Sequence, residues 1–195
     1  HSNDLPHRKH AGKVIHIPLK SHSSGQPGSL DMKSLQENLE KFQDQINYVA
    51  ITGISNVTGI INPIHDIAEL AHSYGALILI DGAQMAAHMP VQMSGYSDPA
   101  KNIDAFVFSG HKTYVPGSPG VVVCRKDILT AIEPEELGGG MVEDVFVDKY
   151  IIKDYFPDRE EAGTPNIPGA IALAAAIEIM DRVGMETIYS EEDEL

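Results

Sequence analysis

The sequence predicts an α/β fold built around a mostly parallel β-sheet. Three features indicate this: segments with helical periodicity alternate with short apolar segments, the short segments are apolar from end to end, and glycine or polar residues separate them. Uninterrupted apolar runs are typical of strands that are covered on both faces, as the strands of a parallel sheet are. The chain has 195 residues, which is enough to bury a sizeable core in one domain.

Five short segments are expected to form strands, because they are apolar and are bounded by polar or glycine-containing stretches. They are residues 13–17, 48–52, 76–80, 105–108 and 120–124. A connector rich in Gly, Ser and Pro, residues 21–29, follows the first of these segments.

Two segments with helical periodicity are expected to pack on this sheet. Residues 32–43 carry apolar side chains at helical spacing, and Asp31 stands before them in the N-cap position. Residues 64–74 show the same pattern, and Gly75 occupies the position just past the expected helix end.

A third helix is expected over residues 171–183, followed by Gly184 and a second helical start. The acidic residues 191–194 suit the first turn of that second helix, because carboxylates are favourable near a helix N-terminus. A helix that stops in its first turn is incomplete, so the sequence predicts a piece of a longer protein.

The charge balance argues against nucleic acid and membrane surfaces as partners. Lys and Arg number 14 against 28 Asp and Glu, which gives a formal net charge of −14. The single cysteine cannot form an internal disulfide, and no apolar run reaches the roughly 20 residues of a membrane-spanning helix. We therefore expect a cytoplasmic protein.

Polar side chains are concentrated just after three of the expected strands. Because ligands of open parallel sheets bind beyond the carboxyl ends of the strands, these side chains are expected to converge at one edge. They are Ser55 and Asn56 after the strand at 48–52, Asp81 and Gln84 after the strand at 76–80, and Ser109, His111 and Lys112 after the strand at 105–108.

This set of side chains fits the demands of pyridoxal phosphate. Lys112 can form a Schiff base, and Asp81 can pair with the ring nitrogen and favour its electron-withdrawing protonated form. The reactive carbon and the ring nitrogen lie at opposite ends of the cofactor, so the amine and the carboxylate must come from different strands. Ser109 and His111 flank Gly110, where backbone amides can approach a phosphate closely.

Each candidate also has a simpler interpretation when it is taken alone. Asp81 could be a helix cap, and Lys112 could be a solvated surface amine. His65 and His72 are seven residues apart and could share a helix face, but two ligands do not make a metal site, and no metal is expected. Cys124 ends an apolar strand and is interpreted as a buried, unreactive thiol. The argument for a site therefore depends on the joint arrangement.

Six short motifs follow one another in order along nearly the whole chain. They are Ser55-Asn56-Val57-Thr58-Gly59, Asn62-Pro63-Ile64, Ala71-His72 with Gly75-Ala76, Asp81-Gly82-Ala83-Gln84, Phe108-Ser109-Gly110-His111-Lys112, and Glu161-Ala162-Gly163-Thr164-Pro165-Asn166. At these residues the sequence resembles the class V aminotransferases of pyridoxal-phosphate fold type I, most closely the cysteine desulfurase and selenocysteine lyase branch.

The resemblance implies a three-layer α/β sandwich with a mostly parallel sheet. Residues 1–195 would form one domain, a fragment of the large pyridoxal-phosphate-binding domain, without its N-terminal segment and without the C-terminal small domain.

The resemblance also implies roles for individual residues. Lys112 would carry pyridoxal 5'-phosphate and later move the proton at the substrate α-carbon, and Asp81 would pair with the pyridine nitrogen. The other cofactor-binding candidates are Asn56 and Gln84 near the phenolic oxygen, Ser109 and His111 at the phosphate, and Gly163 and Thr164 at the phosphate of the neighbouring subunit of a homodimer.

The implied activity is pyridoxal-phosphate-dependent cleavage of a C–S bond in an amino acid through an external aldimine, with a sulfur-acceptor protein as a further partner. Residues 91–104 and the loop 113–120 depart from the family pattern, which leaves the exact reaction open. One alternative keeps the cofactor and changes the chemistry to transamination, β-elimination or epimerisation. Another is a truncated, non-catalytic scaffold or dimerisation piece.

Overall fold

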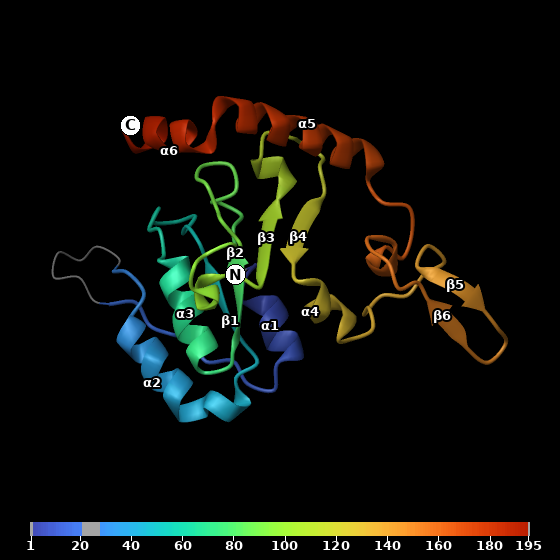
Figure 1. Cartoon of the computed structure of the whole chain (residues 1–195), viewed down its shortest axis with the longest axis horizontal. Helices are drawn as coiled ribbons and strands as arrows, with labels where there is room; N and C mark the ends of the chain where they lie inside the picture. Colours follow the sequence, from blue (N-terminus) through green and yellow to red (C-terminus); the bar gives the residue numbers. More distant parts are fainter. Residues whose placement is uncertain (1, 21–27, 195) are drawn as a thin grey trace.

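A four-stranded sheet forms the centre of the chain (Figure 1). The computed structural model describes residues 2–20 and 28–194. The strands lie in the order β1 (Tyr48–Thr52), β2 (Leu77–Asp81), β3 (Ala105–Ser109) and β4 (Gly120–Cys124). β1, β2 and β3 are parallel, and β4 is antiparallel to β3. The predicted α/β fold with a mostly parallel sheet is therefore confirmed, and these strands lie within one residue of their predicted bounds.

Two helices pack on one face of the sheet. α3 (Ile64–Ser73) packs on β1 and β2, and α2 (Met32–Phe42) packs against α3. The Asp31 carboxylate accepts hydrogen bonds from the backbone N–H groups of Lys33 and Ser34, at 3.1 and 3.2 Å, as an N-cap does. Gly75 follows α3 with a φ of +73°, a conformation that favours glycine.

The apolar core lies between α3 and the sheet. Ile78 and Ile80 of β2 are fully buried there, together with Ile67 of α3. Leu77 and Leu79 alternate with them along β2, point to the other face and are only half-buried. The prediction that the apolar runs are buried on both faces is therefore wrong for β2 within the described residues.

β4 has the predicted bounds, but it is less buried than predicted. Val122 and Val123 keep 64% and 44% of their surface exposed. β4 lies at the end of the strand order and pairs with β3 alone, so one flank of the strand lacks a covering neighbour in the part of the chain that is described.

Residues 13–17 do not form the strand that their apolar pattern predicts. They run as an irregular segment between α1 (Leu5–His10) and α2, and the backbone pairing that follows them is an isolated bridge between Leu19 and Leu30. A strand needs a neighbouring edge to pair with, and hydrophobic pattern alone does not reveal whether such an edge is within reach. The predicted connector at 21–29 lies outside the described residues apart from its last two.

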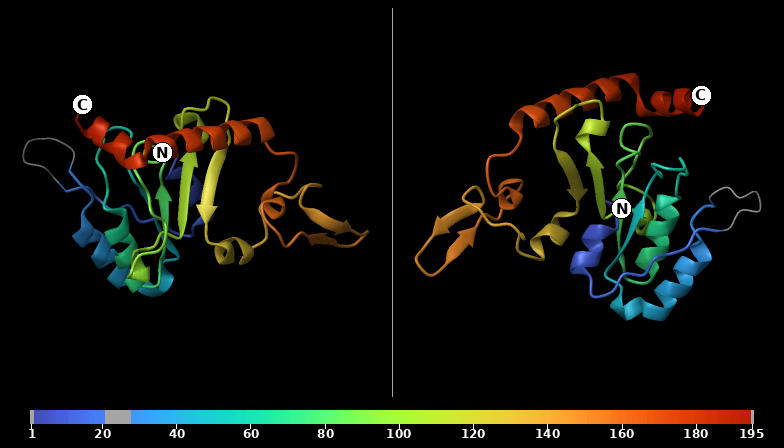
Figure 2. Two further views of the ribbon diagram at one scale, coloured as in Figure 1. Left: turned by 45° about the horizontal axis from the view of Figure 1, so that its top comes forward. Right: turned by 180° about the vertical axis from the view of Figure 1, so that it is seen from behind.

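Two helices run across the carboxyl ends of the parallel strands (Figures 1 and 2). α5 (Ile167–Val183) begins earlier than predicted, and α6 (Met185–Asp193) follows it. The acidic residues 191–194 lie at the end of α6 and not in its first turn, so that prediction is wrong. Near this end of α6, the Glu192 carboxylate contacts the Nδ1 atom of His88.

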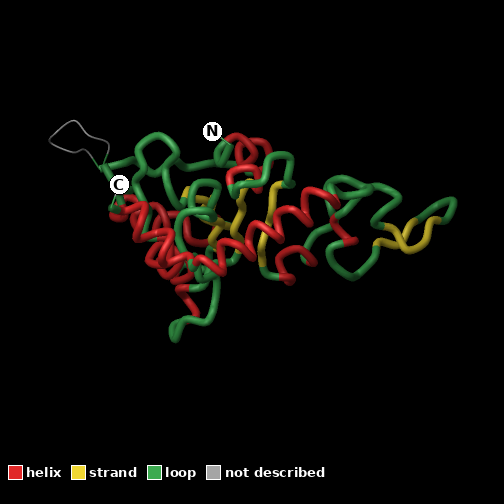
Figure 3. The backbone as a smooth tube through the Cα atoms, turned by 90° about the horizontal axis from the view of Figure 1, so that it is seen from above, coloured by secondary structure: helices red, strands yellow, loops and turns green. Residues whose placement is uncertain are grey.

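The segment between β4 and α5 forms an arm that the sequence analysis did not predict. α4 (Lys126–Thr130) leads to a two-stranded antiparallel hairpin of β5 (Val142–Val145) and β6 (Tyr150–Ile152). Figure 3 shows this hairpin extending away from the four-stranded sheet. Short 3₁₀ helices at Gln43–Gln45, Pro99–Lys101, Gly110–Lys112 and Asp158–Glu160 complete the described elements. Of the helices described, none combines the length and the apolar character needed to cross a bilayer.

Candidate active site

The carboxyl ends of β2 and β3 bring the main candidate residues to one edge of the sheet. Asp81 is the last residue of β2, and Ser109 is the last residue of β3. Asp81 pairs in register with Val107, and Lys112 follows in the 3₁₀ helix that begins directly after β3. The carboxylate and the amine therefore come from neighbouring strands.

The Asp81 carboxylate is half-buried and only partly engaged. Its Oδ1 atom accepts a hydrogen bond from the backbone N–H of Ala83 at 3.0 Å, which is the cap-like role that the simpler interpretation gives it. Among the described residues no hydrogen bond or ion pair involves its Oδ2 atom. One carboxylate oxygen thus fixes the turn after β2, and the other is available to a ligand.

Two glycines allow the backbone to turn tightly at these strand ends. A Cβ atom at Gly82 would collide with the ring of Phe106, and one at Gly110 would collide with Ser118. The backbone N–H of Gly82 also donates to the carbonyl of Val107 at 2.7 Å. The segments that carry Asp81 and Lys112 are therefore packed closely, and only glycine fits at either turn.

Lys112 combines a held backbone with a free amine. The side chain is exposed, and in the described part of the chain its amine makes no ion pair or hydrogen bond. The following residue, Thr113, is 2% exposed and donates its backbone N–H to the carbonyl of Gly110 at 2.9 Å. Tyr114 then adopts a φ of 62°, a left-handed conformation that is uncommon outside glycine and is found often at functional sites. His111, next to Lys112, is also exposed.

A cavity of about 390 Å³ is lined in part by two further candidates, Asn56 and Gln84, whereas Asp81, Ser109, His111 and Lys112 are not among its lining residues. Asn56 is exposed and Gln84 is half-buried. The loop of Asn56 is held by Ser55, whose hydroxyl accepts hydrogen bonds from the backbone N–H groups of the two residues after Asn56. The rest of the lining includes residues of α6 and of the turn after Gln84, namely Tyr189, Glu192, Asp193, His88 and Met89.

The last two candidates, Gly163 and Thr164, are exposed residues before α5. The described residues show no hydrogen bond that joins either of them to Asp81 or Lys112. Their segment is connected to the loop after Lys112 nonetheless, because the side-chain amide of Asn166 donates to the carbonyl of Gly117 at 2.6 Å.

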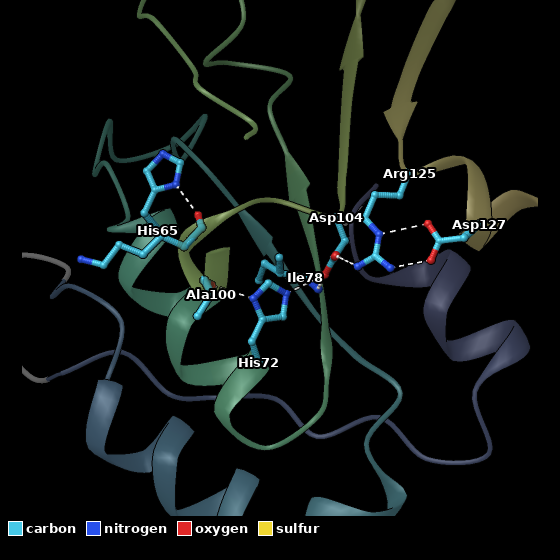
Figure 4. A network of polar contacts seen from close by, with 8 residues as sticks. His65, His72, Ile78, Ala100, Asp104, Arg125 and Asp127 are labelled. Atoms are coloured by element: carbon cyan, nitrogen blue, oxygen red, sulfur yellow. Dashed lines mark hydrogen bonds and ion pairs between the residues drawn. The ribbon is translucent and has the colours of Figure 1, made fainter. Parts of the chain in front are cut away.

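A buried polar network that the sequence analysis missed lies at the other edge of the sheet (Figure 4). Asp104, just before β3, is 2% exposed and contacts His72 and Arg125. His65 and His72 do share one side of α3, as their spacing allows, and their Nδ1 atoms contact the carbonyls of Lys101 and Ala100. No group of three or more metal-ligating side chains is found in the ranges 2–20 and 28–194.

Cys124 is half-buried in β4. Burial is the main factor that raises its pKa, and the nearby carboxylates of Glu160 and Asp127 raise it further. A raised pKa lowers the fraction of thiolate, the nucleophilic form, at neutral pH. The expectation of a buried thiol is therefore met only in part, since Cys124 is half-buried, and its low reactivity stays a prediction.

The fold and the strand-end residues define the class of protein: an α/β protein with a lysine and a carboxylate at the carboxyl edge of a mainly parallel sheet. The profile of the aminotransferase class-V family matches residues 1–195. The chain therefore belongs to the class-V aminotransferases, a family of pyridoxal-phosphate-dependent enzymes.

Two similar proteins within the family are named cysteine desulfurases. The chain is 36% identical over 199 residues to a probable cysteine desulfurase of Halalkalibacterium halodurans, covering 100% of this chain and 46% of that protein. It is 40% identical over 161 residues to a cysteine desulfurase of Synechococcus elongatus, covering 83% of this chain and 25% of that protein. The chain thus spans less than half the length of these curated relatives.

Solved structures of cysteine desulfurases have a fold similar to that of this chain. The cysteine desulfurase CsdA of Escherichia coli superposes with a TM-score of 0.80 at 31% identity, over 96% of this chain and 44% of that one. The cysteine desulfurase of Thermococcus onnurineus superposes with a TM-score of 0.79 at 33% identity, over 95% of this chain and 44% of that one. The mixed α/β architecture with a mainly parallel sheet is thus that of fold type I cysteine desulfurases.

Proposed function

We propose that this chain carries the cofactor-binding part of a cysteine desulfurase that uses pyridoxal 5'-phosphate. The observation that carries the proposal is the pairing of Asp81 and Lys112 at neighbouring strand ends, each with a functional atom that no other described residue engages. The relatives named cysteine desulfurase support the choice of reaction within the family.

The residues fit the cofactor in chemistry as well as in place. Asp81 has a free carboxylate oxygen for a protonated ring nitrogen, and Lys112 has an exposed amine for the aldehyde carbon. Ser109 and His111 stand on either side of Gly110 and offer a hydroxyl and an imidazole to a phosphate. When bound, pyridoxal phosphate supplies an electron sink for negative charge that develops at the substrate α-carbon.

The chain's own residues then perform three tasks. Lys112 holds the cofactor covalently and afterwards carries the proton at the α-carbon, for which its flexible and unpaired side chain is suited. Asp81 keeps the ring nitrogen protonated, because an adjacent negative charge favours the protonated form. Asn56 and Gln84 offer side-chain amides from one cavity to the phenolic oxygen and to a substrate carboxylate.

The wider proposal concerns the whole protein. The substrate is cysteine, the bond that breaks is its C–S bond, and the sulfur passes to an acceptor protein. The described chain is one part of the large domain, and the protein functions in the cytoplasm as a homodimer in which Gly163 and Thr164 reach the phosphate of the neighbouring subunit. Their exposure in the single chain is compatible with such a contact.

One experiment tests the cofactor site directly. The protein is mixed with pyridoxal phosphate, its visible absorbance is recorded, the adduct is reduced with borohydride, and the modified peptide is located by mass spectrometry. We expect an adduct confined to Lys112, and none at that position in Lys112→Ala. An adduct scattered over the exposed lysines, or no adduct, would overturn the proposal.

A further inference from the structure

We propose that His88 and Glu192 form a clasp that holds α6 as one wall of the Asn56–Gln84 cavity and so positions Gln84 for the cofactor. The inference rests on the proposed function and assigns a positioning role to two residues outside the strand-end motifs. It starts from a contact between parts of the chain that are 104 residues apart in sequence.

The clasp is a close contact between an imidazole and a carboxylate. The Nδ1 atom of His88 lies 3.0 and 2.9 Å from the two carboxylate oxygens of Glu192. Both side chains are 40% exposed, so the contact is shielded from water on one side only. It joins the turn after β2 to the last turn of α6.

Gln84 and His88 belong to one hydrogen-bonded segment of backbone, so a displacement of one residue also displaces the other. The backbone N–H of Ala86 donates to the carbonyl of Gly82 at 2.9 Å, and that of Met89 donates to the carbonyl of Met85 at 3.1 Å. Residues four apart in such helical turns lie on the same side, and Gln84 and His88 both line the cavity. A shift of His88 therefore moves the wall that carries Gln84.

α6 is only partly packed against the body of the protein. None of its residues is buried, and Met185, Ile188 and Tyr189 are half-buried. Tyr189, Glu192 and Asp193 are its contributions to the cavity lining, which also includes Asn56 and Gln84. Because no side chain of the helix is fully buried, the contact between His88 and Glu192 contributes to keeping this wall in place.

The test uses the full protein with two variants that break the clasp, His88→Ala and Glu192→Ala. His88→Asn is the conservative variant, because an asparagine amide can donate from near the position of Nδ1. His16→Ala is the matched control, since it removes another histidine–carboxylate contact, with Asp4 at 2.9 Å, on the surface away from the cavity. Each protein is measured for hydrogen–deuterium exchange of residues 185–193 without cofactor and for its dissociation constant with pyridoxal phosphate.

We expect faster exchange over residues 185–193 in both clasp variants, and a dissociation constant raised roughly 2- to 5-fold, as the loss of a half-exposed ion pair implies. His88→Asn and His16→Ala should stay close to the unsubstituted protein. Unchanged exchange, or faster exchange with a dissociation constant no different from that of His16→Ala, would overturn the clasp while leaving the Lys112 adduct intact. If the unsubstituted protein forms no Lys112 adduct, the proposed function and this inference both fail.

Discussion

The Nε2 atom of His72 lies 2.8 Å from Oδ2 of Asp104, a carboxylate that is almost fully buried. The same carboxylate accepts a hydrogen bond from the backbone N–H of Ile78 at 2.8 Å and one from Arg125 at 2.7 Å (Figure 4). His72 belongs to α3, Ile78 to β2, and Arg125 follows β4. The buried Asp104 side chain therefore connects α3, β2 and the residue after β4, which are distant from one another in the sequence.

This network lies at the amino ends of β2 and β3, whereas the candidate site lies at their carboxyl ends. The carboxylates of Asp127 and Asp104 raise the pKa of the Arg125 guanidinium, so this cation remains charged at any pH of interest. Both carboxylate oxygens of Asp104 are hydrogen-bonded to other residues of the protein. In Asp81 only Oδ1 is engaged by a described residue. The two ends of the same strands therefore have different roles, one in holding the sheet to α3 and the other in binding a ligand.

Replacing Asp104 with Ala is expected to lower the free energy of unfolding by about 3–5 kcal/mol, because it leaves buried donors of His72 and Ile78 without an acceptor. Urea unfolding followed by circular dichroism measures the change. Asp127→Ala is the control, since Asp127 binds the same Arg125 but is 65% exposed at its side chain, and its loss should cost less than about 1 kcal/mol. Equal losses in the two variants would contradict a structural role for the buried carboxylate.

Features with local signals could be predicted from the sequence, and those that depend on distant partners could not. The Asp31 cap and the bounds of β4 follow from a few neighbouring residues. Asp104 is bound by residues 32 and 21 positions away, and nothing near it in the sequence indicates that it is buried. The prediction of a strand at residues 13–17 was wrong for the same reason. The apolar pattern of this segment does not reveal whether a strand edge lies within its reach.

The candidate site shows the same division. The places of Asp81 and Lys112 follow from the rule that ligands bind at the carboxyl ends of parallel strands: Asp81 is the last residue of β2, and Lys112 follows β3. The wall that α6 adds to the cavity of Asn56 and Gln84 could not be predicted, because the contact between His88 and Glu192 spans 104 residues.

Asp31 offers a test of the local signals. Asp31→Ala should destabilise the protein by about 1 kcal/mol, because two backbone N–H groups of the first turn of α2 lose their acceptor. Chemical unfolding at neutral pH measures the loss. Lys33→Ala is a suitable comparison, since it changes a neighbouring exposed side chain in the same turn and leaves the cap intact; a loss of equal size there would count against capping.

Cys124 should react slowly with alkylating reagents at neutral pH. Its raised pKa means that the thiolate forms only at higher pH than in a free cysteine, so the rate of carboxymethylation should keep rising at pH values where a small thiol has already reached its plateau. The rate is followed by mass spectrometry of the peptide that contains Cys124, with N-acetylcysteine in the same samples. A plateau at or below that of the free thiol would show that burial and the nearby carboxylates do not act on it.

Asp81→Asn and Lys112→Ala should affect different steps. Asp81→Asn should still form the adduct at Lys112, but turnover of cysteine should fall roughly 100-fold, because an uncharged amide does not hold the proton on the ring nitrogen. Lys112→Ala should lose both the adduct and turnover. The products identify the reaction: alanine with transferable sulfur indicates desulfuration, whereas pyruvate with sulfide indicates β-elimination. Full activity in Lys112→Ala, or loss of the adduct in Asp81→Asn with its fold intact, would show that these two residues do not have the separate roles that their strand ends suggest.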